Sequence, residues 1–238
     1  MNLKHITLVI PAKEEKHCLT RVIRGLKKYK IKKIIVIPKN KKCDYINDTK
    51  AKIVNQSESG YGNALKVGIQ KVKTRYFCIF NADGSFQPNE IAGMQSKLTK
   101  EKLDFVFASR YKNNGKSEDD TYLTKIGNYF FTVVGRIFFS VGITDILYTY
   151  VLGKTISIKK LKIKSNDFSF CIELPIKAQR ADMRYSCIAS HEKARISGVK
   201  KVNEFKDGFK ILAKMIGFFL KNNKITSSTK LKKASKQP

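Results

Sequence analysis

Asp83 is the residue whose type and position point most directly to chemistry. It follows an apolar run at residues 75–80 and precedes Gly84 and Ser85. A carboxylate just past a buried strand can hold a hard divalent cation, which takes oxygen ligands and shares them with substrate phosphates. The same residues also make a good turn, because an Asp side chain accepts hydrogen bonds from the backbone two residues on. Both interpretations of Asp83 stay open on spacing alone.

Basic side chains supply candidate contacts to a phosphate group. The planar fork of arginine matches two phosphate oxygens at once and stays charged. The candidates are Arg110, Arg195, Lys200 and Lys201. Tyr61-Gly62 could bring the backbone amides of a helix start near an anion. The chain holds 48 lysines and arginines, so each of them taken singly is more often a solvated surface charge.

The elements that must position these residues alternate between strands and helices in the first half of the chain. Apolar runs predict strands at residues 6–11, 33–37, 51–55, 75–80 and 104–108, and helical spacing predicts helices at 19–26, 60–72 and 90–102. This alternation indicates an α/β fold with a mostly parallel central sheet and flanking helices. Ligands bind beyond the carboxyl ends of such strands, so the segments 11–15, 81–83 and 108–111 should share one site.

The second half begins with a strongly apolar helical segment at residues 126–143. Its polar members, Asn128, Thr132, Arg136 and Ser140, recur every four residues and form one stripe. The segment approaches the length that spans a bilayer, yet an arginine near its middle would cost about 2.5–3.5 kcal/mol on insertion. We therefore expect this helix to be buried or interfacial rather than spanning.

A second amphipathic helix is predicted at residues 205–220. One face carries Phe205, Phe209, Leu212, Ile216 and Phe219, and lysines mark the other face. A basic face opposite a wide apolar face suits the membrane interface, although a helix packed on the sheet shows the same pattern.

The end of the chain changes composition after this helix. It becomes rich in Lys, Ser and Thr, which predicts a disordered basic tail with some attraction to lipid. We therefore divide the chain into a main domain at 1–203, an amphipathic helix at 204–222 and a tail at 223–238.

Composition limits the class of protein. Hydrophobic residues make up 42%, enough for a core, and the formal net charge of +29 attracts polyanions such as nucleic acid, anionic lipid or phosphorylated substrates. Five scattered cysteines and three histidines argue against a disulfide framework, a zinc site or a histidine metal site, and favour a reducing cytoplasm. The amino terminus lacks the apolar run of a signal peptide, so we expect no export.

Four segments follow one another along the chain, namely residues 8–15 (LVIPAKEE), 60–68 (GYGNALKVG), 81–83 (NAD) and 107–111 (FASRY). Taken in this order, they resemble glycosyltransferase family two, in the polyprenyl-phosphate branch that includes the dolichol-phosphate mannosyltransferases. Residues 8–15 (LVIPAKEE) resemble its V-I-P-A-x-N-E strand and loop, 60–68 (GYGNALKVG) its G-x-G-x-A-x-x-x-G helix start, and 107–111 (FASRY) its G-S-R-Y. Residues 81–83 (NAD) stand where the family has D-x-D, with Pro88 and Glu90 following, and Asp145 stands where its D-x-x-x-G-F segment begins. Arg195, Gly198 and Lys200 resemble its R-x-x-G-x-S-K element. The resemblance covers roughly residues 5–205, and its specificity lies in order and spacing.

The resemblance implies a fold and an activity. The fold would be the nucleotide-diphospho-sugar transferase (GT-A) type, with amphipathic helices near the bilayer. The activity would be inverting hexosyl transfer from a nucleotide-diphospho-sugar to a polyprenyl phosphate. The protein would be peripheral on the cytoplasmic face of a membrane, where an integral membrane partner could hold it.

The resemblance also assigns roles to residues. Asp83 would hold Mg²⁺ or Mn²⁺ against the diphosphate and offset charge on the leaving group. Arg110, Arg195 and Lys200 would orient the acceptor phosphate. The nucleotide-sugar pocket would be formed by Pro11, Ala12, Glu14, Gly60, Asn81, Ala82 and Asp83.

The choice of acceptor has a chemical consequence. A phosphate monoester is already anionic and needs no general base, whereas a sugar hydroxyl normally needs one. No carboxylate or histidine stands out as that base, which favours the phosphate acceptor. Asp145 is the reserve candidate for the base, and its alternative role is to tie down a loop through hydrogen bonds.

Three departures from the family keep alternatives open. Residues 37–40 (IPKN) lack the acidic residues that end the family's second strand, Asn81 replaces the first carboxylate of D-x-D, and residues 145–150 (DILYTY) lack the glycine. The alternatives are transfer to a saccharide hydroxyl, a membrane scaffold of the same fold without activity, and a nucleic-acid-binding protein. The ordered transferase segments and the apolar helices argue against nucleic acid. The sugar, the nucleotide base and the oligomeric state are not fixed by the sequence.

Overall fold

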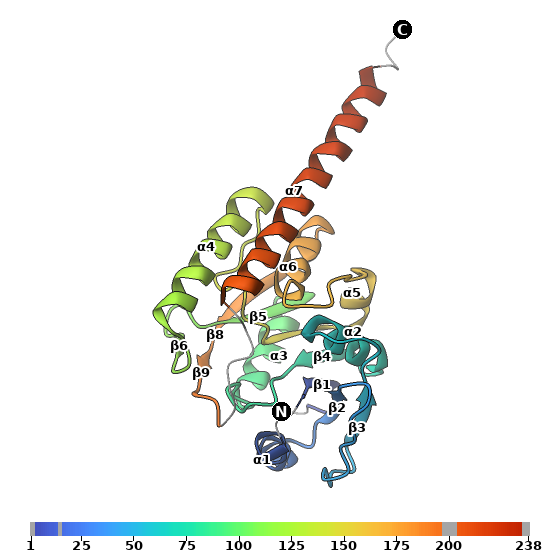
Figure 1. The fold of residues 1–238 in the computed structure, drawn as a ribbon, viewed down its shortest axis with the longest axis vertical. Coiled ribbons are helices and arrows are strands. Elements are labelled where there is room, and N and C mark those ends of the chain that lie inside the picture. The colour runs from blue at the N-terminus through green and yellow to red at the C-terminus, as the bar shows by residue number, and fades with distance from the viewer. Residues whose placement is uncertain (1–2, 14–15, 197–203, 235–238) are drawn as a thin grey trace.

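The structure of the protein is a computed structural model that describes residues 3–13, 16–196 and 204–234. The central sheet of the described chain has seven strands in the order β3-β2-β1-β4-β7-β5-β8 (Figure 1). Only β7 runs antiparallel to its neighbours β4 and β5, so the prediction of a mostly parallel sheet is confirmed. The strands are β1 (Ile6–Pro11), β2 (Lys32–Ile37), β3 (Ala51–Asn55), β4 (Tyr76–Ile79), β5 (Phe105–Ser109), β7 (Val151–Lys154) and β8 (Tyr185–Ala189).

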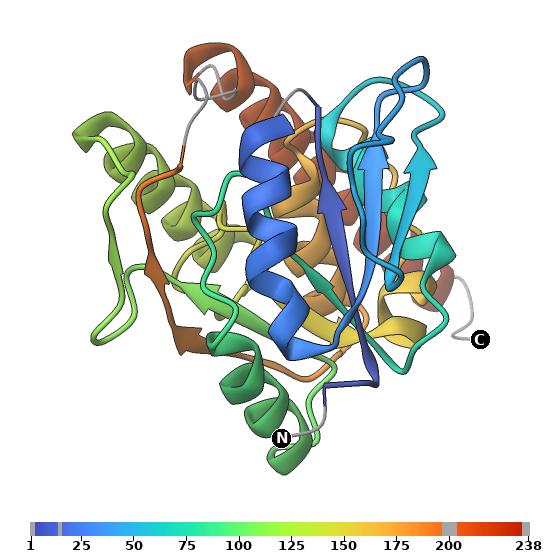
Figure 2. The same ribbon diagram turned by 90° about the horizontal axis from the view of Figure 1, so that it is seen from below.

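Helices cover both faces of this sheet. On one face lie α1 (Lys16–Leu26) and α3 (Glu90–Lys100), with a 3-10 turn, η1 (Lys27–Tyr29), after α1 (Figure 2). The other face packs against α2 (Tyr61–Lys71), α4 (Tyr122–Phe139), α5 (Thr155–Lys160), α6 (Phe170–Arg180) and α7 (Glu204–Ala234). A separate pair of short parallel strands, β6 (Lys116–Ser117) and β9 (His191–Glu192), lies near the start of α4.

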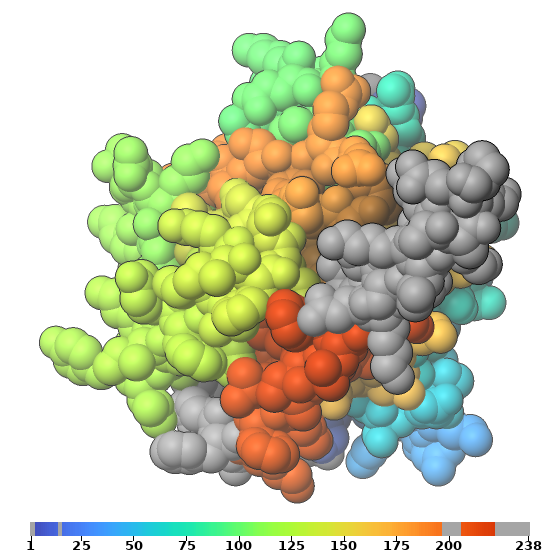
Figure 3. All heavy atoms as spheres, turned by 90° about the horizontal axis from the view of Figure 1, so that it is seen from above, coloured from blue at the N-terminus to red at the C-terminus, as the bar shows by residue number. Residues whose placement is uncertain are grey.

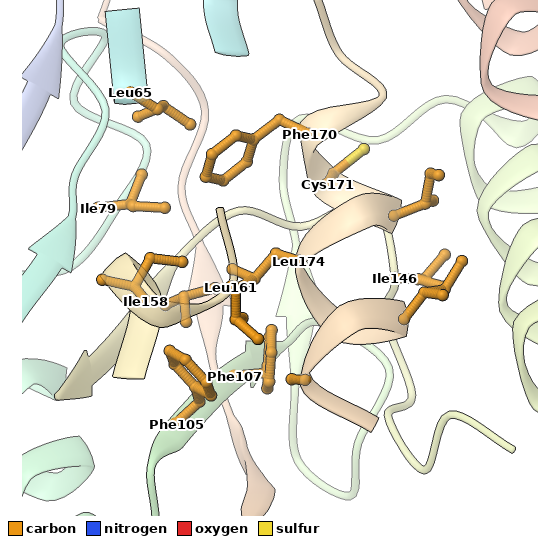
Figure 4. Close-up of a cluster of buried hydrophobic side chains, with 14 of the residues drawn as sticks. Leu65, Ile79, Phe105, Phe107, Ile146, Ile158, Leu161, Phe170, Cys171 and Leu174 are labelled. Atoms are coloured by element: carbon orange, nitrogen blue, oxygen red, sulfur yellow. The ribbon is translucent and has the colours of Figure 1, made fainter. Parts of the chain in front are cut away.

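Alternation along the strands divides the core into two halves. In β1, Leu8 and Ile10 pack with the cluster under α1 and α3, whereas Val9 packs with the cluster under α2. Successive strand residues point to opposite faces, so a strand that is apolar throughout must be covered on both sides. Figure 4 shows the cluster on the α2 side of the sheet, where Phe105 and Phe107 of β5 pack against side chains of α5 and α6.

Helix α4 begins and ends earlier than the predicted segment 126–143. Thr121 caps its start in a reciprocal capping box with Thr124, and Ser140 ends it in the left-handed conformation with φ of 54°. The chain then turns, and the apolar residues Val141 and Ile143 pack into the core instead of continuing the helix. The apolar residues therefore extend beyond the end of α4, which is why the sequence pattern placed the end of the helix too late.

The polar stripe of α4 divides into two parts. Asn128 and Thr132 are buried, and their side-chain oxygens accept hydrogen bonds from the backbone N–H groups of Leu147 (3.0 Å) and Ile146 (3.2 Å). Arg136 and Ser140 are exposed. The buried half of the stripe thus fastens α4 to the segment that leads into β7.

Helix α7 differs from its prediction in length and in its buried face. It continues to Ala234, through residues expected to form a disordered tail, where the sequence holds neither glycine nor proline and includes good helix formers such as Lys, Leu and Ala. Ile211 and Met215 are its buried residues, whereas Phe209 and Ile216 of the predicted apolar face are exposed. The side chains of Phe205 and of residues 222–234 lie outside the described part. Within the described chain, no helix combines the length and hydropathy needed to cross a bilayer.

Candidate active site

A cavity of about 1070 Å³ opens at the carboxyl ends of β1 and β4. Six of the residues predicted to form the nucleotide-sugar pocket line it, namely Pro11, Ala12, Gly60, Asn81, Ala82 and Asp83. Glu14 lies outside the described residues. The parallel strands β1 and β4 are hydrogen-bonded neighbours, so the loops that follow them meet at one edge of the sheet.

Asp83 combines the two roles that its sequence left open. Its Oδ1 accepts hydrogen bonds from the backbone N–H (3.0 Å) and the hydroxyl (2.8 Å) of Ser85, which builds the turn. Its Oδ2 accepts no hydrogen bond among the described residues, and Asp83 lines the cavity. One carboxylate oxygen therefore shapes the loop while the other stays available.

The residues at Asp83 fit a divalent cation that is shared with a phosphate ligand. Among the described residues, no three His, Cys, Asp or Glu side chains gather into a site that could hold a metal alone. Mg²⁺ in phosphate sites commonly takes one or two carboxylates from the protein and completes its shell with phosphate oxygens and water. A single available oxygen on Asp83 matches that pattern.

Gly60 and Tyr61 form the wall of the cavity at the start of α2. Gly60 has φ of 120°, and a Cβ there would lie 2.2 Å from the backbone oxygen of Asn166, so only glycine fits. The Tyr61 ring stacks on Phe168 with centroids 4.8 Å apart, and its hydroxyl bonds the hydroxyl of Thr149 at 2.6 Å. Burial raises the pKa of Tyr61, which keeps this hydroxyl protonated. The sequence at Tyr61-Gly62 indicated a role for the backbone amides but none for this ring.

Glu173 of α6 holds the loop at residues 164–169 that backs this wall. Its carboxylate is buried and accepts the backbone N–H groups of Lys164 (2.8 Å) and Ser165 (2.7 Å), with Lys177 at 2.7 Å. Burial would raise the pKa of Glu173, but the hydrogen bonds from Lys177, Ser165 and the backbone lower it below its usual value. Its stabilising effect should be complete above the unfolded-state pKa and lost as pH falls through the lower folded-state pKa.

We therefore expect Glu173→Gln to lower the free energy of unfolding at pH 7 by about 1–3 kcal/mol, because neutral Gln replaces a charge-assisted acceptor. The gap between wild type and variant should narrow as pH falls below about 4.3, the usual glutamate pKa. Urea unfolding followed at several pH values measures this gap. A gap that stays constant from pH 7 to pH 3 would contradict the role of the charge.

Arg110 is the centre of a buried charge cluster beside the cavity. Its Nε and Nη2 donate to the two oxygens of Asp145 at 2.7 and 2.9 Å, and its Nη1 donates to Asp120 (3.2 Å) and Glu192 (3.1 Å). The guanidinium also lies 4.6 Å from the ring centroid of Tyr148. Burial would lower the pKa of Arg110, but these carboxylates, Asp145 foremost, raise it well above its usual value.

This cluster bears on the roles predicted for Arg110 and Asp145. Arg110 lines the cavity, but its side chain is only 10% exposed and its Nε, Nη1 and Nη2 already donate to carboxylates, so its contact with a phosphate stays a prediction. The Asp145 carboxylate has 0% exposure, does not line the cavity and accepts from the Arg110 backbone as well. The geometry makes Asp145 a positioning residue for Arg110 rather than a base, because a base must reach the reacting group.

The other carboxylates of the cluster were not predicted from the sequence. Asp120 and Glu192 line the cavity, and burial raises the pKa of Glu192 although Arg110 opposes the shift. Ser117 donates to Glu192 at 2.5 Å, and Tyr111 donates to Asp120. The pair Asp119-Asp120, in a chain so rich in lysine, was the available signal.

Arg195 reaches the cavity near Asp83. The backbone N–H of the next residue, Ile196, donates to the Asp83 carbonyl at 2.9 Å, which brings the segment after β9 onto the Asp83 loop. The Arg195 guanidinium pairs with Asp119, with Nε at 3.0 Å from Oδ1, and both residues line the cavity. Lys200, with Gly198, lies outside the described residues.

Comparison with known families gives this arrangement a context. Residues 7–161 match the family described as glycosyl transferase family 2, which is more than half of the chain. The chain belongs to glycosyl transferase family 2. It is thus a glycosyltransferase, and the family resemblance proposed from its motifs is confirmed at that level. The matched range contains the Asp83 turn, the Gly60 helix start and the Arg110–Asp145 pair.

This glycosyltransferase is similar in sequence to one protein and in structure to another. It is 23% identical to the uncharacterized protein MJ1222 of Methanocaldococcus jannaschii over 91% of this chain and 93% of that protein. It is similar, with a TM-score of 0.66 and 13% identity, to glucosyl-3-phosphoglycerate synthase from Mycobacterium tuberculosis solved with Mn²⁺, UDP and glucosyl-3-phosphoglycerate. That likeness covers 89% of this chain and 78% of the synthase. A second structure of that synthase, solved with Mn²⁺, UDP-glucose and phosphoglyceric acid, gives a TM-score of 0.65 at 14% identity, with coverage of 89% and 78%. At such identity the likeness shows the nucleotide-sugar transferase fold alone.

Proposed function

We propose that this glycosyltransferase moves a hexosyl group from a nucleotide-diphospho-sugar to a polyprenyl phosphate at a membrane surface, with a divalent metal and with inversion. The observation that carries the proposal is the course of the cavity. It begins at Asp83 and continues among apolar side chains of α4 and α7, including Leu123, Ile126, Phe131 and Ile211. A phosphate on a long apolar chain suits such a cavity, because its two halves match the two ends of the ligand.

The proposed reaction needs no proton transfer. An oxygen of the anionic acceptor phosphate attacks the anomeric carbon, the bond from that carbon to the diphosphate oxygen breaks, and the nucleoside diphosphate leaves with the electron pair. A divalent cation supplies charge stabilisation on the diphosphate. Asp83 would hold that cation through Oδ2, and Arg195 would turn from Asp119 to the acceptor phosphate. Lys200 stays a proposed contact to the same phosphate.

An exposed apolar surface on α4 and α7 supports placement at a membrane. Figure 3 shows the two helices side by side on one face of the molecule. Large apolar side chains of both helices are exposed, with Tyr129 71% and Phe209 74% exposed. Exposed basic residues Lys125, Arg136 and Lys210 accompany them on the same helices. Apolar side chains interleaved with basic ones are typical of helices that lie in the interface of an anionic bilayer.

We expect the double change Tyr129→Glu and Phe209→Glu to weaken binding to anionic vesicles by on the order of 100-fold, because burial of each large apolar side chain contributes about 1.5–3 kcal/mol. Flotation with vesicles that contain phosphatidylglycerol measures the bound fraction. The double change Ile53→Glu and Ile156→Glu is the matched control, since it adds the same charge at side chains that are 37% exposed on β3 and 64% exposed on α5. If the test variant and the control variant lose the same fraction of vesicle binding, charge alone causes the effect. That result would remove the support for a membrane-binding surface on α4 and α7.

The experiment that tests the proposed function is product identification. The purified protein is incubated with a panel of sugar nucleotides, Mg²⁺ or Mn²⁺, and a polyprenyl phosphate in vesicles, and the lipid fraction is analysed for glycosylated phosphate. We expect one donor to give a polyprenyl-phosphate sugar that needs the metal. Transfer only to saccharide hydroxyls, or no transfer with any donor, would overturn the proposal.

A further inference from the structure

Two glycines, one on α4 and one on α7, face open space along the cavity. Gly127 of α4 and Gly208 of α7 both line it. A Cβ built on Gly127 would meet no atom within 4 Å, and one built on Gly208 would only reach the Phe131 ring at 4.0 Å. Glycine in a helix interior costs about 1 kcal/mol relative to alanine, so two glycines that line one cavity without a packing reason suggest room kept for a ligand.

Asn128, next to Gly127, has a side-chain donor without a partner. Its Oδ1 accepts the backbone N–H of Leu147 at 3.0 Å, which fixes the amide orientation, because the reversed amide would set its NH₂ against that N–H. Its Nδ2 is buried and has no hydrogen-bond partner in the described structure. Asn128 is 1% exposed and lines the cavity. An unsatisfied buried donor costs about 1–3 kcal/mol, which an anionic oxygen of a ligand would offset.

We propose that the passage between α4 and α7 is the binding groove for the acceptor's hydrocarbon chain, that Gly127 and Gly208 set its width, and that Asn128 donates to the acceptor's phosphate where the groove begins. This inference rests on the proposed function and adds residues that determine the acceptor's chemistry. The hydrocarbon chain of the acceptor enters between α4 and α7. Its methyl branches need the width that the two missing side chains provide. The amide of Asn128 selects a ligand with an anionic oxygen at the inner end of its chain.

Gly208→Leu tests the groove, because leucine fills the open space and raises helix propensity, so the fold is retained. We measure transfer to a long-chain polyprenyl phosphate and to dimethylallyl phosphate, which carries a single isoprenyl group. The variant should raise KM for the long-chain acceptor by on the order of tenfold and leave KM for dimethylallyl phosphate unchanged. Gly217→Leu is the control on the same helix, since Gly217 has no atom within 4 Å of a built Cβ and does not line the cavity.

Asn128→Asp tests the polar end. Aspartate keeps an oxygen for the Leu147 N–H but replaces the free NH₂ by a second oxygen, which repels an anion. KM should rise for both acceptors by on the order of tenfold, whereas metal-dependent binding of the sugar nucleotide, measured by calorimetry, should not change. If Asn128→Asp weakens sugar-nucleotide binding as much as it raises KM for the acceptors, Asn128 acts on the whole site and its assignment is overturned.

The outcomes separate the inference from the function on which it rests. A wild-type protein that uses neither lipid phosphate would overturn the proposed function and the occupant of the groove together. If the wild type is active and Gly208→Leu has the same KM for the long-chain acceptor, the inference alone is overturned. An equal rise in KM for both acceptors in Gly208→Leu would also overturn it, because the short acceptor does not reach the groove.

Discussion

Asp83→Asn should lower kcat for sugar transfer by on the order of 10³-fold, the largest effect on activity that we expect from a single change. Asparagine keeps an oxygen to accept the Ser85 N–H and hydroxyl, so the turn survives. It replaces the Oδ2 that is available to a cation by an uncharged NH₂ group. Steady-state assays with the natural sugar donor and saturating Mn²⁺ or Mg²⁺ measure the loss, and removal of the metal with EDTA should give a similar loss in wild type.

Asp167→Asn is the matched control for this experiment. Asp167 also builds a local turn, its Oδ1 accepting the backbone N–H of Ser169 at 3.0 Å, but it does not line the cavity that contains Asp83. Its variant should keep wild-type kcat. If Asp83→Asn keeps more than about a tenth of wild-type activity with unchanged metal dependence, Asp83 does not hold the metal.

Arg110→Met should lower the free energy of unfolding by about 3–5 kcal/mol, the largest effect on stability that we expect. The change leaves Asp145, Asp120 and Glu192 in a buried cluster without the cation that all three share. Urea unfolding at pH 7 measures the loss. The loss should shrink as pH falls and Glu192, whose pKa burial raises, takes up a proton, because the neutral carboxyl group no longer needs a cation.

Arg195→Met provides the comparison for Arg110→Met. Arg195 pairs with one carboxylate, Asp119, and both side chains are partly exposed, so this change should cost about 1 kcal/mol or less. It should instead raise KM for the acceptor phosphate. A similar stability loss in the two variants would contradict the central position of Arg110, and a loss in Arg110→Met that does not change with pH would contradict the role of the unpaired carboxylates.

Local sequence pattern was sufficient for the first half of the fold. The strands from β1 to β5 are runs of apolar residues between helical segments, and their order along the chain places Pro11 and Asp83 at one edge of the sheet. By contrast, β7 is four residues long and contains Gly153, so no local pattern identifies it. It becomes a strand because it pairs with β4 and β5. A Cβ on Gly153 would lie 2.4 Å from the Phe105 ring, a constraint that only the folded chain reveals.

The site shows the same division between local and distant information. Asp83 was predictable because its turn is formed by neighbours in the sequence. The pairing of Arg110 with Asp145 and Glu192 joins residues 35 and 82 positions apart, and the sequence alone left Arg110 free to contact a phosphate. Likewise, helical spacing on α7 could not decide which of two overlapping apolar faces packs on α4. The structure buries Ile211 and Met215 and exposes Phe209.

The central claim is that the acceptor is a phosphate on a long apolar chain, and one competition measurement tests it most directly. With the preferred sugar nucleotide and metal, the protein is offered polyprenyl phosphate in vesicles and 3-phosphoglycerate in solution, and kcat/KM is determined for each acceptor. The apolar cavity between α4 and α7 predicts at least about a 100-fold preference for the polyprenyl phosphate, since a small charged acceptor leaves that end of the cavity unused. Equal values, or a preference for 3-phosphoglycerate, would contradict the claim.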